Sequence, residues 1–127
     1  MLINTHKQIN TNLCGTPLIV EKNYCRIELK TTNEMSSDKY GLVHGGFIFG
    51  AADYAAMLAV NHPNVVLGSS TVKFLKPVKV DEIVTIDAKI KEVNNKKNVV
   101  YVRAKVCSVD VFEGEFTCFI LDKHILA

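Results

Sequence analysis

The amino-acid sequence predicts an α+β fold in which one antiparallel β-sheet curls around a single long helix. Two observations carry this prediction. Residues 47–60 form a run of apolar and small side chains with one acidic group, Asp53, and a helix that is apolar on nearly every face is one that protein surrounds. The second half of the chain alternates apolar and polar residues, as strands do when one sheet face is buried. With one long helix to cover that face, the sheet has to wrap around it.

The first half of the chain is expected to contain one strand before the helix. Residues 3–13 are polar and predict a short helix or an irregular arm, and residues 17–29 mix apolar and charged side chains in the partial alternation of a strand. Residues 31–41 carry loop-forming residue types. The helix at residues 47–60 is rich in alanine and ends at Asn-His-Pro, residues 61–63, because proline cannot continue a helix.

The second half is expected to contain four strands joined by short connections. Alternating segments that predict these strands lie at residues 65–75, 82–93, 99–112 and 116–126. Turn-forming residues separate the last three segments at positions 94–97 and 113–115. Long strands and tight turns predict an antiparallel meander. One strand, a central helix and four strands make the hotdog architecture, and we interpret residues 1–127 as one hotdog domain.

Composition and charge exclude several classes of protein. The formal net charge of +2 is too small to indicate a nucleic-acid surface, although mild basicity suits an anionic ligand. The four cysteines form no Cys-x-x-Cys pair, and no histidine lies close enough to suggest a zinc knuckle, so we expect reduced thiols and no metal site. The N-terminus lacks a signal-peptide pattern, and the apolar run is shorter than the ~20 residues that span a membrane. The sequence therefore predicts a cytoplasmic protein without membrane or nucleic-acid partners.

Asp53 is the first candidate catalytic residue. An unpaired charge is costly to bury, and the helix positions three and four residues away hold no basic side chain that could neutralise it. An apolar setting raises the pKa of a carboxyl group and makes it a better base near neutral pH. We interpret Asp53 as the general base that activates a water, with a nucleophilic role less favoured. The alternative is a structural acid bonded to the backbone or to a neighbouring side chain.

The start of the helix is the second candidate. Gly45 and Gly46 fall where the first backbone N–H groups lack helical partners and can polarise a carbonyl that approaches the glycines. The alternative is tight packing at a helix start. Gly45 and Asp53 are eight positions apart, about 12 Å along a helix, so one carbonyl cannot meet both groups of the same helix. We therefore expect a homodimer with antiparallel helices, or a tetramer of two such dimers, with Gly45 of one subunit beside Asp53 of the other.

These residues resemble the signature of a known family. The pattern resembles that of PaaI-like hotdog acyl-CoA thioesterases in Gly41, the His-Gly-Gly motif at residues 44–46 and Asp53. The resemblance extends over residues 37–120 and includes the strand–proline–strand passage at 73–84. The family implies hydrolysis of an acyl-CoA thioester to a free acid and coenzyme A. It also implies an active site shared across a dimer interface and no metal or organic cofactor.

The resemblance marks further site residues, with two departures. Asp38 stands where the family often has asparagine, and an ionised aspartate accepts hydrogen bonds but cannot donate an amide N–H. The family can also place a serine or threonine in the site from the strand after the helix, and the residues of that type here are Ser69, Ser70 and Thr71. His44 orients the ligand or Asp38, or else caps the helix.

Two assignments keep an alternative. Phe47 lines an acyl channel or belongs to the core, and Lys73 meets coenzyme A phosphates or is a solvated strand-end charge. The predicted catalytic set is Asp53, Gly45 and His44. The predicted substrate-binding set is Asp38, Gly46, Phe47, Ser69, Ser70, Thr71 and Lys73. Other functions on the same fold are a non-catalytic acyl-CoA-binding regulator, which has no need of a carboxylate beside a thioester, and a purely structural dimer.

Overall fold

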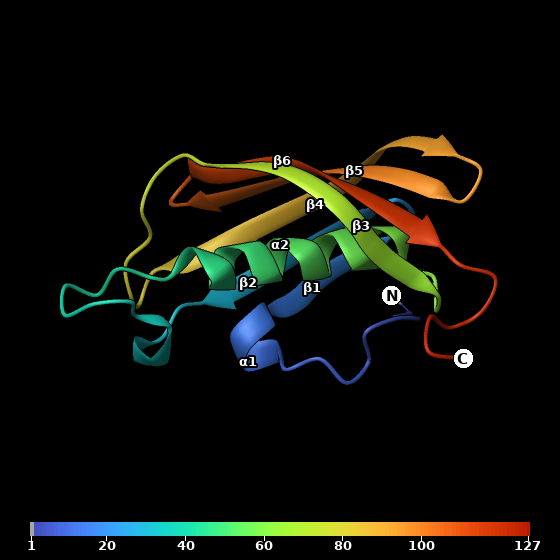
Figure 1. The fold of residues 1–127 in the computed structure, drawn as a ribbon. Coiled ribbons are helices and arrows are strands. Elements are labelled where there is room, and N and C mark those ends of the chain that lie inside the picture. The colour runs from blue at the N-terminus through green and yellow to red at the C-terminus, as the bar shows by residue number, and fades with distance from the viewer. Residues whose placement is uncertain (1) are drawn as a thin grey trace.

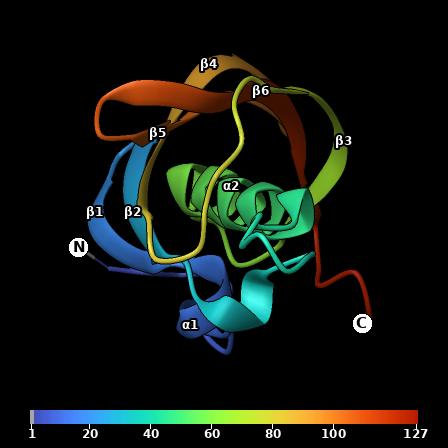
Figure 2. The ribbon, with the colours of Figure 1, turned by 90° about the vertical axis from the view of Figure 1, so that its left-hand side faces the viewer.

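The computed structural model describes residues 2–127. Six strands form one antiparallel sheet in the order β1-β2-β4-β5-β6-β3, and helix α2 runs through its hollow (Figure 1). Figure 2 shows the sheet curving around α2 from β1 over β5 to β3. The elements are α1 (Thr11–Cys14), β1 (Thr16–Glu21), β2 (Tyr24–Lys30), the 3-10 turn η1 (Asn33–Met35), α2 (Gly45–Val60), β3 (Val65–Phe74), β4 (Ile83–Asn94), β5 (Lys97–Val106) and β6 (Val109–Ile120). This arrangement confirms the predicted α+β hotdog architecture.

Helix α2 is buried because its side chains are small or aliphatic on most sides. Ile48 and residues 51, 52 and 54–59 are all buried. The helix stops at Asn61, which has a left-handed φ of 54° and donates its backbone N–H to the Met57 carbonyl at 2.7 Å. The predicted stop is confirmed, and the helix begins at Gly45, where the sequence places its first turn, two residues before the apolar run at 47–60. No helix among residues 2–127 is both long enough and apolar enough to cross a membrane.

The N-terminal half contains one strand more than the sequence predicts. Residues 17–29 are expected to form one strand, whereas the chain forms a hairpin of β1 and β2 that turns at Lys22 and Asn23. Asn23 has a φ of 66°, a left-handed conformation that asparagine adopts more easily than most residues. A Lys-Asn turn without glycine is a weak hairpin signal, which explains the error. The polar arm before the hairpin ends in the short helix α1.

A second correction concerns the connection between β5 and β6. The predicted turn at residues 113–115 is wrong, and of the predicted last strand at 116–126 only the part up to Ile120 is strand. The chain turns at Cys107 and Ser108, whose φ angles are 49° and 67°, and β6 runs through Gly114 to Ile120. A Cβ at position 114 would lie 2.6 Å from Cγ1 of Val72 on β3. Close strand packing, and not a turn, therefore requires this glycine.

The register of the sheet sorts the side chains onto two faces. The concave face packs on α2 and holds fully buried rings such as Phe112 and Phe116. On the convex face, residues of alternating charge stand opposite one another on five adjacent strands, in the order Arg26, Asp87, Arg103, Glu113 and Lys73. We call these five residues the charged row. Opposite charges on neighbouring strands are favourable pairs, so the row stabilises the register of a solvated face.

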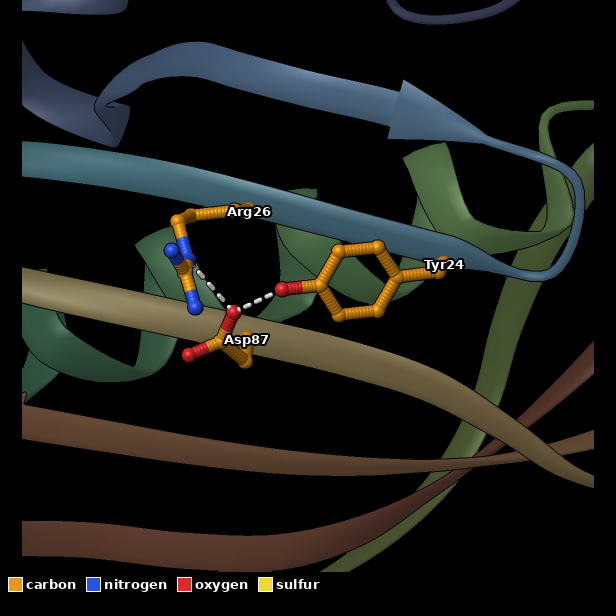
Figure 3. Close-up of polar contacts among 3 residues, drawn as sticks. All are labelled: Tyr24, Arg26 and Asp87. Carbon is orange, nitrogen blue, oxygen red and sulfur yellow. Dashed lines mark hydrogen bonds and ion pairs between the residues drawn. The ribbon is translucent and has the colours of Figure 1, made fainter.

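One end of the charged row belongs to a cluster of three side chains, shown in Figure 3. Asp87 Oδ1 accepts a hydrogen bond from the Tyr24 hydroxyl and another from Arg26 Nε at 2.8 Å. The Arg26 side chain is 42% exposed and that of Asp87 29%, so solvent weakens the ion pair. Burial and the hydrogen bond to Asp87 raise the pKa of Tyr24 to about 12.

We expect Tyr24→Phe to lower the free energy of unfolding by about 0.5–1.5 kcal/mol at pH 7, because one hydrogen bond is lost. A raised tyrosine pKa stabilises the fold fully below about pH 10, where the unfolded tyrosine ionises, and this contribution disappears as the pH rises through about 12. Urea unfolding of both proteins between pH 7 and pH 11 measures the difference. Equal free energies at pH 7 would show that the hydrogen bond makes no net contribution.

Candidate active site

The start of α2 is held in place by backbone hydrogen bonds. Val43 donates its N–H to the Val78 carbonyl, and His44 donates its N–H to the carbonyl of the buried Met35, both at 2.9 Å. His44 is the extended N-cap residue of α2, but its ring makes no capping hydrogen bond, so capping by the His44 side chain is contradicted. The residues before the first turn of α2 are thus fixed to η1 and to the connection between β3 and β4. The N–H groups at its start lack partners within the helix and are available to a ligand.

Aromatic rings flank the two glycines of this first turn. A Cβ at Gly45 would lie 3.1 Å from Cε1 of Phe74, and a Cβ at Gly46 would lie 3.0 Å from Cδ2 of His44. Carbon atoms prefer separations of about 3.5–4.0 Å, so glycine avoids a clash at both positions. The His44 ring also meets Phe47 edge to face, with ring centroids 6.3 Å apart. The structure therefore brings His44, Gly45, Gly46 and Phe47 together.

A pocket of about 330 Å³ opens beside Gly45. Its walls come from the helix start, the end of β3, the connection to β4 and the start of β6, and they include Leu42, Ile48, Phe74, Leu75, Val78 and Val111. Lys76 is the charged residue of this wall. A carbonyl group that accepted a hydrogen bond from the Gly45 N–H would therefore have an apolar pocket beside it.

Asp53 lies on a side of α2 that the other described residues, 2–127, leave partly uncovered. Gly46, Phe49, Gly50 and Asp53 are partly or fully exposed, and their spacing of three or four residues places them on one helix face. We call these four residues the open stripe. A Cβ at Gly50 would contact nothing within 4 Å. Since Phe49 carries the one large side chain of the open stripe, another helix can approach α2 closely on this face.

The Asp53 carboxyl group is partly buried without a partner. Its Oδ1 atom is buried and has no hydrogen-bond partner among residues 2–127. This contradicts the alternative of an internally bonded structural acid. Burial disfavours the charged form and raises the pKa of Asp53 to about 6. A carboxyl group with this pKa is largely ionised at neutral pH yet basic enough to accept a proton from water.

The register of β3 separates the four candidate residues of this strand. Ser70 stands opposite the buried Phe116, so it lies on the concave face with α2. Ser69, Thr71 and Lys73 lie on the convex face, where Lys73 is part of the charged row. The structure therefore brings Ser70 to the helix side of the sheet and does not bring the other three there.

Asp38 lies in the loop that leads to the helix start. Its Oδ1 accepts hydrogen bonds from the backbone N–H groups of Tyr40 at 2.9 Å and Leu42 at 3.3 Å. Leu42 also lines the pocket beside Gly45. Asp38 thus shapes the rim of the pocket through the backbone, using the acceptor capacity that aspartate and asparagine share.

Phe74 is a site residue that the sequence does not indicate. An aromatic residue in an alternating strand predicts a core position, whereas Phe74 is 56% exposed and lines the pocket. Its proximity to Gly45 depends on how β3 ends beside α2, which no local sequence pattern encodes. Residues 2–127 gather no three histidine, cysteine, aspartate or glutamate side chains of the kind that hold a metal, and the four cysteines are free thiols.

A curved antiparallel sheet around one helix defines a hotdog-fold protein, and the pocket at the helix start and the unpartnered acid on the helix form its candidate site. Residues 40–110, more than half of the chain, match the model of the thioesterase superfamily. The chain therefore belongs to the thioesterase superfamily. Its fold also resembles the Escherichia coli PaaI protein from the phenylacetic acid degradation operon, with a TM-score of 0.81, 18% identity, and coverage of 88% of this chain and 83% of that one.

Several solved structures share this fold. An uncharacterized protein from Pyrococcus horikoshii is 48% identical, with a TM-score of 0.99 over 100% of this chain and 98% of that one. A sigma28-regulated virulence protein from Campylobacter jejuni is 33% identical, with a TM-score of 0.95 over 98% and 89% of the two chains. A Streptococcus mutans protein bound to acetyl CoA is 22% identical, with a TM-score of 0.82 over 93% and 97%, and at this identity the likeness shows the fold alone.

The curated relatives are longer proteins. Methylthioribose-1-phosphate isomerase of Aquifex aeolicus is 53% identical over 123 residues, which are 96% of this chain but 27% of the isomerase. The transcription factor FapR of Caldanaerobacter subterraneus is 28% identical over 75% of this chain and 48% of the factor. The chain thus spans about a quarter of the isomerase and about half of the transcription factor.

Proposed function

We propose that this chain is an acyl-CoA thioesterase, which hydrolyses an acyl-CoA to a free acid and coenzyme A. The observation that carries the proposal is one helix with two complementary groups: available N–H groups at Gly45 and Gly46, and the unpartnered carboxyl group of Asp53. Membership of the thioesterase superfamily supports it. The acetyl CoA bound by the Streptococcus mutans protein supports a coenzyme A thioester as the ligand, with no metal or organic cofactor.

The proposed reaction uses Asp53 as general base. Asp53 takes a proton from a water molecule, whose oxygen forms a bond to the thioester carbonyl carbon. Negative charge then develops on the carbonyl oxygen, where the N–H groups at Gly45 and Gly46 stabilise it. The carbon–sulfur bond breaks, and the coenzyme A thiolate takes up the proton that Asp53 accepted. Attack by the Asp53 carboxylate itself, through an anhydride, is the less favoured route.

The two groups meet only if two copies of the chain contribute to each site. Gly45 and Asp53 are eight positions apart on one helix, about 12 Å. The open stripe allows two α2 helices to pack antiparallel, because Gly46 and Gly50 carry no side chain. Within residues 2–127, β3 is an edge of the sheet, and pairing with the β3 of a second copy would satisfy its backbone groups. We therefore propose a homodimer, or a tetramer of two such dimers.

The remaining predicted residues take different places in this proposal. His44, Phe47 and Ser70 lie on the helix side and contact the substrate near the thioester, with His44 orienting it. Asp38 acts through the loop that it holds. Ser69, Thr71 and Lys73 lie on the convex face, so they reach only a part of coenzyme A that extends past the edge of β3.

A second candidate function is an acyl-CoA-binding regulator without catalysis. The similarity to the transcription factor FapR over 75% of this chain favours it. The Asp53 carboxyl group opposes it, because binding alone gives no reason to keep an unpartnered acid on the helix. Thiol release from acyl-CoAs with short, long and aromatic acyl groups separates the two functions, since a regulator releases none. The match to the isomerase covers 27% of that enzyme, and we do not propose isomerase activity for this chain.

A mixture of two impaired variants tests the shared site. Gly45→Ala should keep the fold, since alanine favours helices, but lower kcat/KM about 10-fold or more, because its methyl group meets Phe74 and crowds the carbonyl. Asp53→Asn removes the base. In a mixed dimer, one site combines an intact Gly45 with an intact Asp53. Co-refolded variants should regain about a quarter of wild-type activity, because about half of the random dimers are mixed and each has one good site.

Each variant refolded alone is the control for this experiment. A co-refolded sample no more active than the mean of the two controls would contradict the shared site. If the wild-type protein releases no thiol from any acyl-CoA of the panel, the proposed hydrolysis is wrong, whatever the mixture does.

A further inference from the structure

Phe74 lines the apolar pocket and lies beside the start of α2. It is the last residue of β3 and stands opposite Phe112, which is fully buried on the concave face. The two rings meet edge to face with centroids 5.2 Å apart, an arrangement favourable to both rings. One edge of the Phe74 ring lies so close to Gly45 that an added Cβ there would be 3.1 Å from Cε1. Packing on two sides therefore holds the ring beside the first turn of the helix, although much of it is exposed.

The pocket suits a small apolar group. Its volume of about 330 Å³ is near the lower end of the range of about 300–1,000 Å³ for ligand pockets. Ile48, Val78 and Val111 supply hydrocarbon surface, which offers nothing to a polar substituent. A thioester carbonyl bound at Gly45 would place its acyl group in this pocket, because Gly45 is part of the pocket wall.

Beyond Phe74, the concave face of β3 carries smaller side chains. Val72 and Ser70 follow at alternate positions on the same face, and Ser70 is exposed. The Phe74 ring therefore separates the pocket from Val72 and Ser70, the smaller residues of β3 on this face. An acyl chain longer than the pocket would have to displace the ring to reach that surface.

We infer that Phe74 limits the length of the acyl group, so that the substrates are acyl-CoAs with short apolar chains. This inference rests on the proposed function, because it assumes that Gly45 binds the thioester carbonyl. Phe74 is a specificity-determining residue in this account and takes no part in bond making or breaking. Replacing the ring by a methyl group should extend the pocket along β3 and admit longer chains.

Thiol release from acetyl-, butyryl-, hexanoyl-, octanoyl- and decanoyl-CoA tests the inference. Wild type should have a kcat/KM for butyryl-CoA about 10-fold or more above that for octanoyl-CoA. Phe74→Ala should raise the octanoyl-to-butyryl ratio of kcat/KM by about 10-fold or more, because a single methylene group can change such a ratio by about 10-fold or more. The control is Phe119→Ala, which removes an equal ring from a residue that is 36% exposed on the convex face. Its ratio should equal that of wild type.

The possible outcomes separate the inference from the proposed function. Wild-type hydrolysis with an unchanged ratio in Phe74→Ala would overturn the role of Phe74 and leave the thioesterase proposal standing. If wild type hydrolyses none of the substrates, the thioesterase proposal fails. Calorimetry then gives the dissociation constants of octanoyl- and butyryl-CoA for wild type and Phe74→Ala. An octanoyl-to-butyryl ratio that is equal in the two proteins would again overturn the role of Phe74. Should Phe74→Ala melt far below wild type, Phe74→Leu takes its place, with an intermediate shift in the ratio expected.

Discussion

Asp53→Asn is expected to lower kcat/KM for acyl-CoA hydrolysis by about 10²-fold or more, the usual scale for loss of a general base. Asparagine keeps the shape of the side chain but accepts no proton from water. The melting temperature at pH 7 should be equal to or above that of wild type, because the variant no longer places a partly buried carboxylate on the helix. Binding of acyl-CoA should survive, since the pocket beside Gly45 holds the acyl group and Asp53 contacts only the attacking water in the proposed mechanism. Thiol release, thermal melting and calorimetry with the same preparation measure all three.

The pH dependence of the wild-type protein provides a second readout of the same residue. Because burial raises the pKa of Asp53 to about 6, kcat/KM should rise with pH through about 6 as the base loses its proton. A raised carboxyl pKa stabilises the fold fully below the unfolded value of about 4, and this stabilisation is lost as the pH rises through about 6. Wild type should therefore lose stability relative to Asp53→Asn between about pH 4 and pH 6.

Other roles of Asp53 predict different results. A structural role predicts a lower melting temperature for Asp53→Asn and activity lost only through unfolding. A regulator without catalysis predicts no thiol release from wild type. Full hydrolysis by a stable Asp53→Asn variant would remove this residue from the mechanism.

Gly50→Arg is expected to convert the protein into a folded monomer and to abolish hydrolysis, with a loss of about 10²-fold or more because each site then lacks its base. The single chain has room for the new side chain, since a Cβ at Gly50 contacts nothing within 4 Å. Arginine also favours helix over glycine by about 0.5–1 kcal/mol, so the monomer should not melt earlier through α2 itself. Two arginines facing each other across the open stripe would keep the helices of two copies apart. Analytical ultracentrifugation at micromolar concentration measures the assembly.

Gln8→Arg is the matched control, because it adds the same charge at an exposed position outside the open stripe. It should assemble and hydrolyse as wild type does. A Gly50→Arg protein that remains dimeric and active would show that the open stripe is not the interface. A wild-type protein that is monomeric at the same concentration would contradict the shared site directly.

The long elements of the fold follow from local sequence patterns. The apolar run predicts α2, and the alternation of apolar and polar residues predicts β3 and β4. Both patterns are strong because burial determines which positions are apolar. The errors lie at turns with weak local signals. Cys107 and Ser108 adopt positive φ angles, which neither residue type indicates, while Gly114 suggested a turn and instead allows close strand packing.

Part of the candidate site could be predicted from the sequence for a similar reason. Gly45 and Asp53 stand out because each is an unusual residue type for its position on a helix. The sequence could not predict which sheet face each residue of β3 occupies. A β-bulge between Leu67 and Ser69 shifts the pairing with β6, and a one-residue shift moves every side chain to the other face. The position of Phe74 beside Gly45 depends on contacts between segments far apart in the chain, which periodicity does not record.

The two walls of the pocket differ in how readily they accept amino-acid substitutions during evolution. The groups assigned to chemistry lie on α2, a buried helix that accepts few substitutions. Part of the opposite wall is the connection between β3 and β4, with Leu75, Lys76 and Val78, and connections accept substitutions and insertions more readily than the elements they join. After a gene duplication, one copy can therefore acquire a new acyl preference through this connection while its helix stays unchanged. Relatives with the same helix residues are thus expected to differ in substrate.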